Sequence, residues 1–227
     1  LMLDALTASF RVASFAARPL WPGSDPAAAG SWRDLADDLR GELARRGAHG
    51  AIGAGHSLGS VLAVLAAAAE PGLFRALILV DPVIFSGAHS LFWGVFKGLH
   101  LGHRLPLIRS AQRRRARFPD RDAVRASWSA KSVFGTWLPE VLEDYVRSGT
   151  VEDGNGGVTL RYPKAWEARI FELTPASVWP ELRRIELPML VLRGEGSDTF
   201  LAAAARRLGR ELPSATVVEL AGCSHFA

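Results

Sequence analysis

The strongest constraint on the fold is the alternation of apolar, strand-like runs with segments of helical periodicity. Residues 76–80 form an apolar run without polar alternation, which is typical of a strand buried on both faces. Residues 31–47 begin with a capping-box-like pair, Ser31 and Asp34, and then repeat apolar residues at three- and four-residue spacing, which predicts an amphipathic helix. This alternation predicts a mostly parallel sheet flanked by helices. The expected strands are residues 11–17, 51–55, 76–80, 189–192 and 215–220, and the expected helices are residues 31–47, 60–70 and 200–212.

The alternating pattern breaks at Asp81-Pro82 and resumes only at Pro188. Residues 83–186 contain 13 of the 20 aromatic residues, so this stretch must bury substantial surface. We therefore expect an α/β core formed by residues 1–82 and 187–227, with residues 83–186 inserted as a largely helical cap. Within the insertion, the glycine-rich residues 153–157 predict a tight turn of a hairpin leading into residues 158–160.

Composition excludes several classes of protein. The chain has 227 residues, of which 48% are apolar and 22% charged, and this balance is that of a globular protein. The single cysteine, Cys223, excludes an internal disulfide, and no run of about 18 uncharged apolar residues offers a membrane span. No basic segment precedes an apolar stretch at the start, so we expect a cytoplasmic protein, and secretion stays open because we expect the native gene to extend further upstream.

The basic residues are concentrated in the middle of the chain. Residues 97–117 contain seven lysines and arginines and no acidic residue. Aromatic residues are not interleaved with them as base-stacking platforms require, so we interpret the segment as a solvated helix face and expect no nucleic-acid partner. Whether it contacts another anionic partner stays open.

The residues most informative about chemistry are 55–59, with the sequence Gly-His-Ser-Leu-Gly. A strand enters this G-x-S-x-G motif and a helix leaves it, which is the context of a nucleophile elbow. The elbow holds its serine in a strained conformation, and we expect side chains at both glycine positions to collide with neighbouring backbone. Ser57 is therefore the candidate nucleophile.

A serine hydroxyl needs a general base, and the base needs an orienting carboxylate. His225 follows the last expected strand and is the candidate base. Asp198 follows the strand at 189–192 and is the preferred acid, while Glu195 in the same loop and Asp81 at another strand end are alternatives. Because Pro82 restricts Asp81 to extended conformations, we expect Asp81 to launch the insertion instead.

With these motifs and the insertion in the cap position, nearly the whole chain resembles a member of the α/β-hydrolase superfamily, in its serine-nucleophile, esterase- and lipase-like branch. The resemblance implies a sheet of about eight strands. It also implies Ser57, Asp198 and His225 as the catalytic triad and the backbone N–H of Leu58 as one oxyanion-hole donor. A serine nucleophile disfavours the dehalogenase and epoxide-hydrolase branches, which use aspartate at that position. The family has further strands before residues 11–17 and a closing helix after the histidine, so we expect the native gene to extend beyond both ends.

These observations predict hydrolysis of carboxylic esters through an acyl-enzyme intermediate. Thioesterase, carbon–carbon-bond hydrolase and acyltransferase activities use the same triad and stay open, as does a non-catalytic, ligand-binding relative. The expected partner is a small-molecule ester with an apolar acyl group, and the oligomeric state is left open. We expect no cofactor and no metal, because no carboxylate or thiol joins His89, His100 and His103 at ligand spacing.

Overall fold

The computed structural model describes residues 2–99 and 105–226. The fold divides into two compact units. Residues 29–105 and 170–227 form one, called here the sheet unit, and residues 1–28 and 106–169 form the other, called the aromatic unit.

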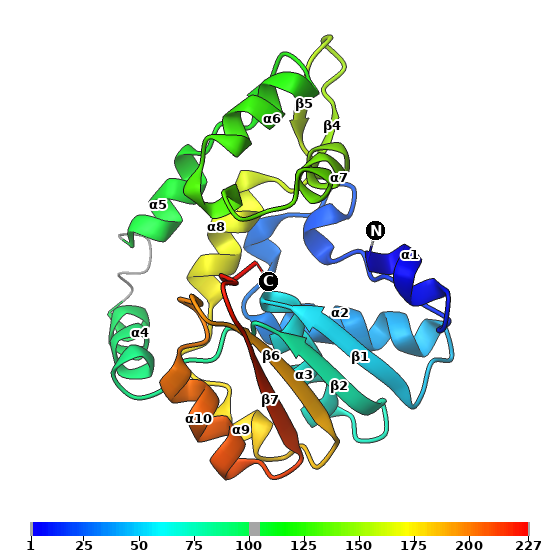
Figure 1. Ribbon diagram of the computed structural model, residues 1–227, viewed down its shortest axis with the longest axis vertical. Coiled ribbons are helices and arrows are strands. Elements are labelled where there is room, and N and C mark those ends of the chain that lie inside the picture. Colours follow the sequence, from blue (N-terminus) through cyan, green and yellow to red (C-terminus); the bar gives the residue numbers. More distant parts are fainter. Residues whose placement is uncertain (1, 100–104, 227) are drawn as a thin grey trace. The chain divides into compact units, whose positions relative to one another are not determined.

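The sheet unit contains a parallel sheet in the strand order β1-β2-β6-β7 (Figure 1). Its elements confirm the predicted mostly parallel sheet and all the predicted strands and helices from residue 31 onward, with small shifts at their ends. The helices α3 and α10 pack on the sheet, and α2 packs on α3. The elements are α2 (Trp32–Arg45), β1 (Ala51–His56), α3 (Leu58–Ala69), β2 (Phe74–Val80), α4 (Ala88–Gly98), α9 (Trp179–Leu182), β6 (Met189–Gly194), α10 (Ala202–Glu211) and β7 (Ala215–Leu220), with the end of α8 (Lys164–Leu173).

Local sequence explains how α2 begins. The Ser31 hydroxyl accepts a hydrogen bond from the N–H of Arg33, and the Asp34 carboxylate accepts one from the N–H of Ser31. These bonds satisfy N–H groups that the first helical turn leaves unpaired. The predicted capping box is therefore confirmed, and it directs Trp32 and Leu35 into the core.

The two faces of the sheet differ in burial. Leu77, Leu79 and Val191 are fully buried, whereas Ile78 is only half-buried and Leu190 is exposed. The prediction that residues 76–80 are buried on both faces is therefore wrong for the described residues, because they cover one face of β2 more completely than the other.

The predicted strand at residues 11–17 is not formed. These residues pair with no strand in the described part of the chain, and most of them are exposed. Their carbonyls are used locally, since the Trp21 indole donates to Ala16 O at 2.7 Å and Leu20 N–H donates to Ala17 O at 2.8 Å. The described residues accordingly form a four-stranded parallel sheet rather than the eight strands that the family resemblance implies.

The aromatic unit carries a small antiparallel sheet in the order β3-β5-β4. Asp153 accepts hydrogen bonds from the N–H groups of Asn155 and Gly157, and this closes the predicted hairpin between β4 and β5. The unit's core combines aromatic and aliphatic side chains, with Trp128 and Phe134 stacked. Its elements are α1 (Met2–Thr7), η1 (Arg18–Leu20), η2 (Pro26–Ala28), α5 (Pro106–Arg113), β3 (Arg117–Phe118), α6 (Arg121–Ser129), η4 (Ser132–Phe134), α7 (Pro139–Gly149), β4 (Thr150–Glu152), β5 (Val158–Leu160) and the start of α8.

The boundaries of the units differ from those expected for a cap at residues 83–186. Residues 83–105 and 170–186 belong to the sheet unit, and residues 1–28 join residues 106–169. Indole hydrogen bonds contribute to this grouping, because Trp93 donates to Thr174 O at 2.8 Å and Trp179 donates to Phe85 O at 2.7 Å. These bonds connect the two ends of the predicted cap within the sheet unit.

Among the described helices, none is both long and apolar enough to cross a membrane. The described part of the basic segment 97–117 includes α5, which buries Ile108 and Ala111 and exposes Arg109 and Arg113, while Arg114 pairs with Glu167 at 2.7 Å. This agrees with the interpretation of a solvated helix face. Residues 100–104, with the candidate ligands His100 and His103, lie outside the described residues.

Candidate active site

The predicted elbow lies between β1 and α3, with Ser57 at its tip. Ser57 has a φ of 53°, a conformation that non-glycine residues rarely adopt and that is typical of a strained nucleophile turn. Two bonds secure the turn: Ser57 N–H donates to Val80 O at 2.9 Å, and the Ser60 hydroxyl donates to Gly55 O at 2.6 Å. The strained serine is thereby held between two neighbouring strands.

The two motif glycines have different reasons to be there. A Cβ atom at Gly55 would lie 2.3 Å from the backbone carbon of Gly59, so a side chain at position 55 cannot be accommodated without moving the elbow. A Cβ atom at Gly59 would meet nothing within 4 Å. The expected steric requirement therefore holds for Gly55, and it is wrong for Gly59 because that position faces open space.

The structure brings Ser57 and His225 together, although 168 positions separate them. His225 Nε2 lies 2.9 Å from Ser57 Oγ, and His225 Nδ1 lies 3.0 Å from Asp81 Oδ1. The Asp81 side chain is fully buried, and that of His225 is mostly buried. A hydroxyl, an imidazole and a carboxylate thus stand in the order that nucleophilic serine chemistry requires.

The carboxylate beside His225 is therefore Asp81 and not Asp198, which corrects the sequence-based assignment of the acid. Asp198 is exposed. Asp81 has a φ of 41°, so Pro82 does not keep it extended as expected. The Asp81 N–H donates to Leu192 O at 2.8 Å, and this bond holds the turn that aims its carboxylate at His225. Glu195 accepts the N–H of Gly222 at 2.9 Å and so helps to hold the histidine loop.

The Asp81 carboxylate is surrounded by hydrogen-bond donors. Gly194 N–H donates to Oδ2 at 2.8 Å, and the hydroxyls of Ser197 and Thr199 donate to Oδ1. Burial by itself raises the pKa of Asp81, but the hydrogen bonds from His225, Ser197 and Gly194 outweigh it and hold the pKa below its ordinary value. Asp81 is therefore ionised at neutral pH.

Thr199 is a further site residue that sequence reasoning missed. Its Oγ1 lies 2.8 Å from His225 Nδ1 and 3.1 Å from Asp81 Oδ1. If the hydroxyl donates to Asp81, it accepts from Nδ1–H, so that the imidazole proton is shared between two oxygens. This arrangement favours the tautomer that leaves Nε2 free to accept the Ser57 proton.

Close packing at the end of β6 positions the histidine loop. A Cβ atom at Gly194 would lie 2.1 Å from Ser224 O, so the loop can pass this closely only over a glycine. Gly196 N–H also donates to Cys223 O at 2.9 Å. His225 is thereby held over the carboxyl ends of the parallel strands.

His56, the first of the two variable residues of the motif, contacts His225. Its Nε2 donates to His225 O at 2.8 Å, and the two ring centroids are 4.8 Å apart. Desolvation lowers the pKa of His56, whose ring also lies beside that of Phe226, although the residue is exposed.

Leu58 is the first residue of α3, so its N–H belongs to a helical turn whose N–H groups have no acceptor within the helix. This position is suited to the oxyanion-hole role expected for Leu58. Across the described residues, no group of three or more histidine, cysteine or acidic side chains is arranged to hold a metal ion.

The site consists of a strained serine that follows a parallel strand, an imidazole hydrogen-bonded to it and a buried carboxylate that contacts the imidazole. This arrangement defines a nucleophilic serine site on an α/β sheet. The sequence matches the family described as "Alpha/beta hydrolase family" over residues 2–227. The chain belongs to this family.

Individual relatives agree with this classification. The chain is 27% identical over 197 residues to 2-(acetamidomethylene)succinate hydrolase of Mesorhizobium japonicum, covering 85% of this chain and 64% of that protein. A crystal structure of E-2-(acetamidomethylene)succinate hydrolase is similar with a TM-score of 0.69 and 26% identity, covering 90% of this chain and 70% of that one. An α/β hydrolase from Novosphingobium aromaticivorans is similar with a TM-score of 0.65 and 25% identity, covering 89% and 68%. The chain thus spans less than two thirds of the curated relative that it matches.

Proposed function

We propose that this protein is a serine hydrolase that cleaves carboxylic esters through an acyl-enzyme intermediate. The observation that carries the proposal is the contact of 2.9 Å between Ser57 Oγ and His225 Nε2, at a serine whose φ is 53°. Such strain is retained in proteins where the surrounding structure enforces it, and it is concentrated at functional sites.

The geometry supports a role for each group. His225 Nε2 accepts the Ser57 proton as Oγ attacks the substrate carbonyl, and the Leu58 N–H donates to the developing oxyanion. Asp81 then stabilises the imidazolium through Nδ1–H, with Thr199 as a positioning residue. The imidazolium returns the proton to the leaving group, and a water molecule activated by the same histidine releases the acid.

A small-molecule ester with an apolar acyl group remains the proposed substrate. A second candidate is a carboxylate-bearing substrate of the kind named for the Mesorhizobium relative, and the 27% identity to that protein favours it. Thioesters, carbon–carbon bonds and acyl transfer use the same catalytic groups. A panel of esters and thioesters of graded acyl length compares the two bond types directly. It also shows the preferred acyl length, because each buried methylene contributes about 0.8 kcal/mol of binding energy.

The test combines a covalent probe with turnover. A fluorophosphonate should label the wild-type protein at Ser57, located by peptide mass spectrometry, and should not label Ser57→Ala. Ser57→Ala should lower turnover of the best ester about 10⁴- to 10⁶-fold without changing the circular dichroism spectrum. A folded Ser57→Ala protein that keeps more than a tenth of the activity would contradict the assignment, and absent labelling of the wild type would favour a ligand-binding relative.

A further inference from the structure

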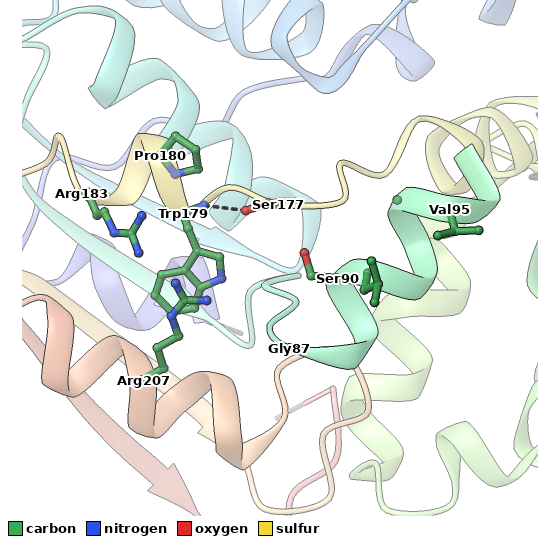
Figure 2. A pocket seen from close by; sticks show the side chains of 10 residues that line it. Gly87, Ser90, Val95, Ser177, Trp179, Pro180, Arg183 and Arg207 are labelled. Atoms are coloured by element: carbon green, nitrogen blue, oxygen red, sulfur yellow. Dashed lines mark hydrogen bonds between the residues drawn. The ribbon is translucent and has the colours of Figure 1, made fainter. Parts of the chain in front are cut away.

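A cavity of about 630 Å³ lies within the sheet unit, between α4, α9 and α10 (Figure 2). It is separate from the candidate active site, because Ser57, Asp81 and His225 are not among the residues that line it. Its volume is within the range of about 300–1,000 Å³ that is typical of sites for small molecules. The lining residues are Gly87, Ser90, Leu91, Gly94, Val95, Ser177, Trp179, Pro180, Arg183 and Arg207.

One side of the cavity is cationic. The guanidinium of Arg207 lies over the indole ring of Trp179, 3.9 Å from its centroid, and Figure 2 shows the two side chains stacked. Trp179 is itself buried and is held by its bond to Phe85 O. A guanidinium stacked on a fixed aromatic ring loses little conformational freedom when it binds a ligand.

The cationic side carries an excess of one positive charge. Arg207 donates its Nε–H to one oxygen of Glu211 at 2.6 Å, and Arg183 donates Nε–H and Nη2–H to the other oxygen at 3.1 and 2.8 Å. Two guanidinium groups therefore share one carboxylate. The terminal amino groups of Arg207 have no hydrogen-bond acceptor among the described residues, and no acidic residue is among those that line the cavity.

Two serine hydroxyls, those of Ser90 and Ser177, also line the cavity. Ser177 Oγ accepts the N–H of Trp179 at 3.3 Å, which leaves the hydroxyl proton available for a ligand (Figure 2). The guanidinium N–H groups can only donate, so the polar end of a ligand that binds them must be an acceptor. A planar carboxylate matches the fork of guanidinium N–H groups.

The opposite wall is apolar. Leu91 and Val95 lie one turn apart on α4 and are 70% and 49% exposed. The helix α4 is attached to the segment before α9, since Ser90 donates to Ala176 O at 2.6 Å and Lys97 Nζ donates to Thr174 O at 2.9 Å. The exposed apolar residues are therefore presented on a helix that is held in place.

We propose that this cavity binds an organic monocarboxylate with an apolar chain, with its carboxylate on Arg207 and Arg183 and its chain along Leu91 and Val95. The single excess positive charge favours a monoanion over a dianion, because a second negative charge would face no further cation of the lining. The proposal does not depend on catalysis, since it uses no residue of the triad.

The test is isothermal titration of the full chain with decanoate, with decanol as the uncharged analogue. Decanoate should bind with one site outside the triad, and decanol should bind at least tenfold more weakly because it cannot form charge-assisted bonds to the guanidiniums. Arg207→Gln should weaken decanoate binding about tenfold or more. Arg206→Gln, an exposed arginine on the same helix that does not line the cavity, should leave it unchanged.

A second variant keeps the test decisive if Arg207→Gln disturbs the packing on Trp179. Leu91 is exposed, so Leu91→Glu should fold, and its carboxylate should weaken decanoate binding at least tenfold more than Leu91→Gln does. Equal affinity for decanoate and decanol, or unchanged affinity in Leu91→Glu, would overturn the proposal. The absence of decanoate binding at millimolar concentration would also overturn it.

Discussion

Replacing Asp81 by asparagine should impair the site much more than the same change at Asp198. The Asp81 carboxylate accepts Gly194 N–H on Oδ2 and three donors, including His225 Nδ1–H, on Oδ1. An asparagine side chain has one acceptor oxygen and one NH₂ group. Its NH₂ group must therefore face either the Gly194 N–H or the His225 Nδ1–H, and both of these are donors.

Either orientation of the new amide has a defined cost. With NH₂ toward His225, the imidazole changes tautomer and places its proton on Nε2, where it can no longer accept from Ser57. With NH₂ toward Gly194, an N–H group loses its acceptor, which costs about 1–3 kcal/mol of stability. In a serine protease triad the corresponding asparagine lowers turnover about 10⁴-fold through the wrong tautomer, and we expect a loss of at least about 10² here.

Asp198→Asn is the matched control, because Asp198 is exposed in the same part of the unit. Surface substitutions usually change stability by less than about 0.5 kcal/mol, so Asp198→Asn should fold normally. Since the triad hydrogen bonds join Ser57, His225, Asp81 and Thr199 and do not include Asp198, we expect a change in rate of no more than about threefold. The assay is the second-order rate of fluorophosphonate labelling at one pH, with ester turnover as a second readout and circular dichroism as the folding control. If Asp198→Asn lost more activity than Asp81→Asn in folded proteins, the carboxylate role would return to Asp198 and the reasoning from geometry would be refuted.

Two further predictions concern stability. Gly55→Ala should destabilise the fold by about 1–3 kcal/mol or more, because its Cβ would overlap the Gly59 backbone. Gly59→Ala is the control and should cost less than about 1 kcal/mol. Comparable shifts of the thermal midpoint in the two variants would contradict this prediction. The pKa of Asp81 lies below its ordinary value, so its ionised form contributes stability that is present above about pH 4 and is lost as the pH falls through the lowered pKa. Urea unfolding at pH 7 and at pH 3 should therefore show the wild type losing its advantage over Asp81→Asn at the lower pH, and an advantage that stays constant would count against the lowered pKa.

The parts of the fold that could be predicted from the sequence are those in which local pattern decides the structure. The capping box at Ser31 and Asp34 and the strand–turn–helix around Ser57 both depend on residues within a few positions of each other. Residues 11–17 have the composition of a strand, but a strand also needs a partner, and here Trp21 and Leu20 take the carbonyls of residues 16 and 17.

The identity of the acid could not be predicted in the same way. Asp81 and Asp198 both follow parallel strands, so strand position does not distinguish them. The choice depends on donors distant in sequence: Gly194 and Thr199 lie 113 and 118 positions from Asp81. Only the assembled sheet places these groups around one carboxylate, and Thr199 has no motif of its own that could have identified it.

The register of the sheet explains why these distant residues meet. Among the described residues other than glycine, Ser57 and Asp81 are the two with positive φ, and each follows directly on one of two paired strands. Each strained turn is attached to the next strand in the order, Ser57 N–H to Val80 O and Asp81 N–H to Leu192 O. The same sequence of pairings continues to β7, where Gly194 pairs with Leu220, five residues before His225.

A shift of one strand by one residue would break one of these bonds and move one triad member by about 3.3 Å, which exceeds the tolerance of a hydrogen bond. The backbone pairing of β1, β2, β6 and β7 therefore stabilises the fold and also sets the distances between the serine, the carboxylate and the histidine.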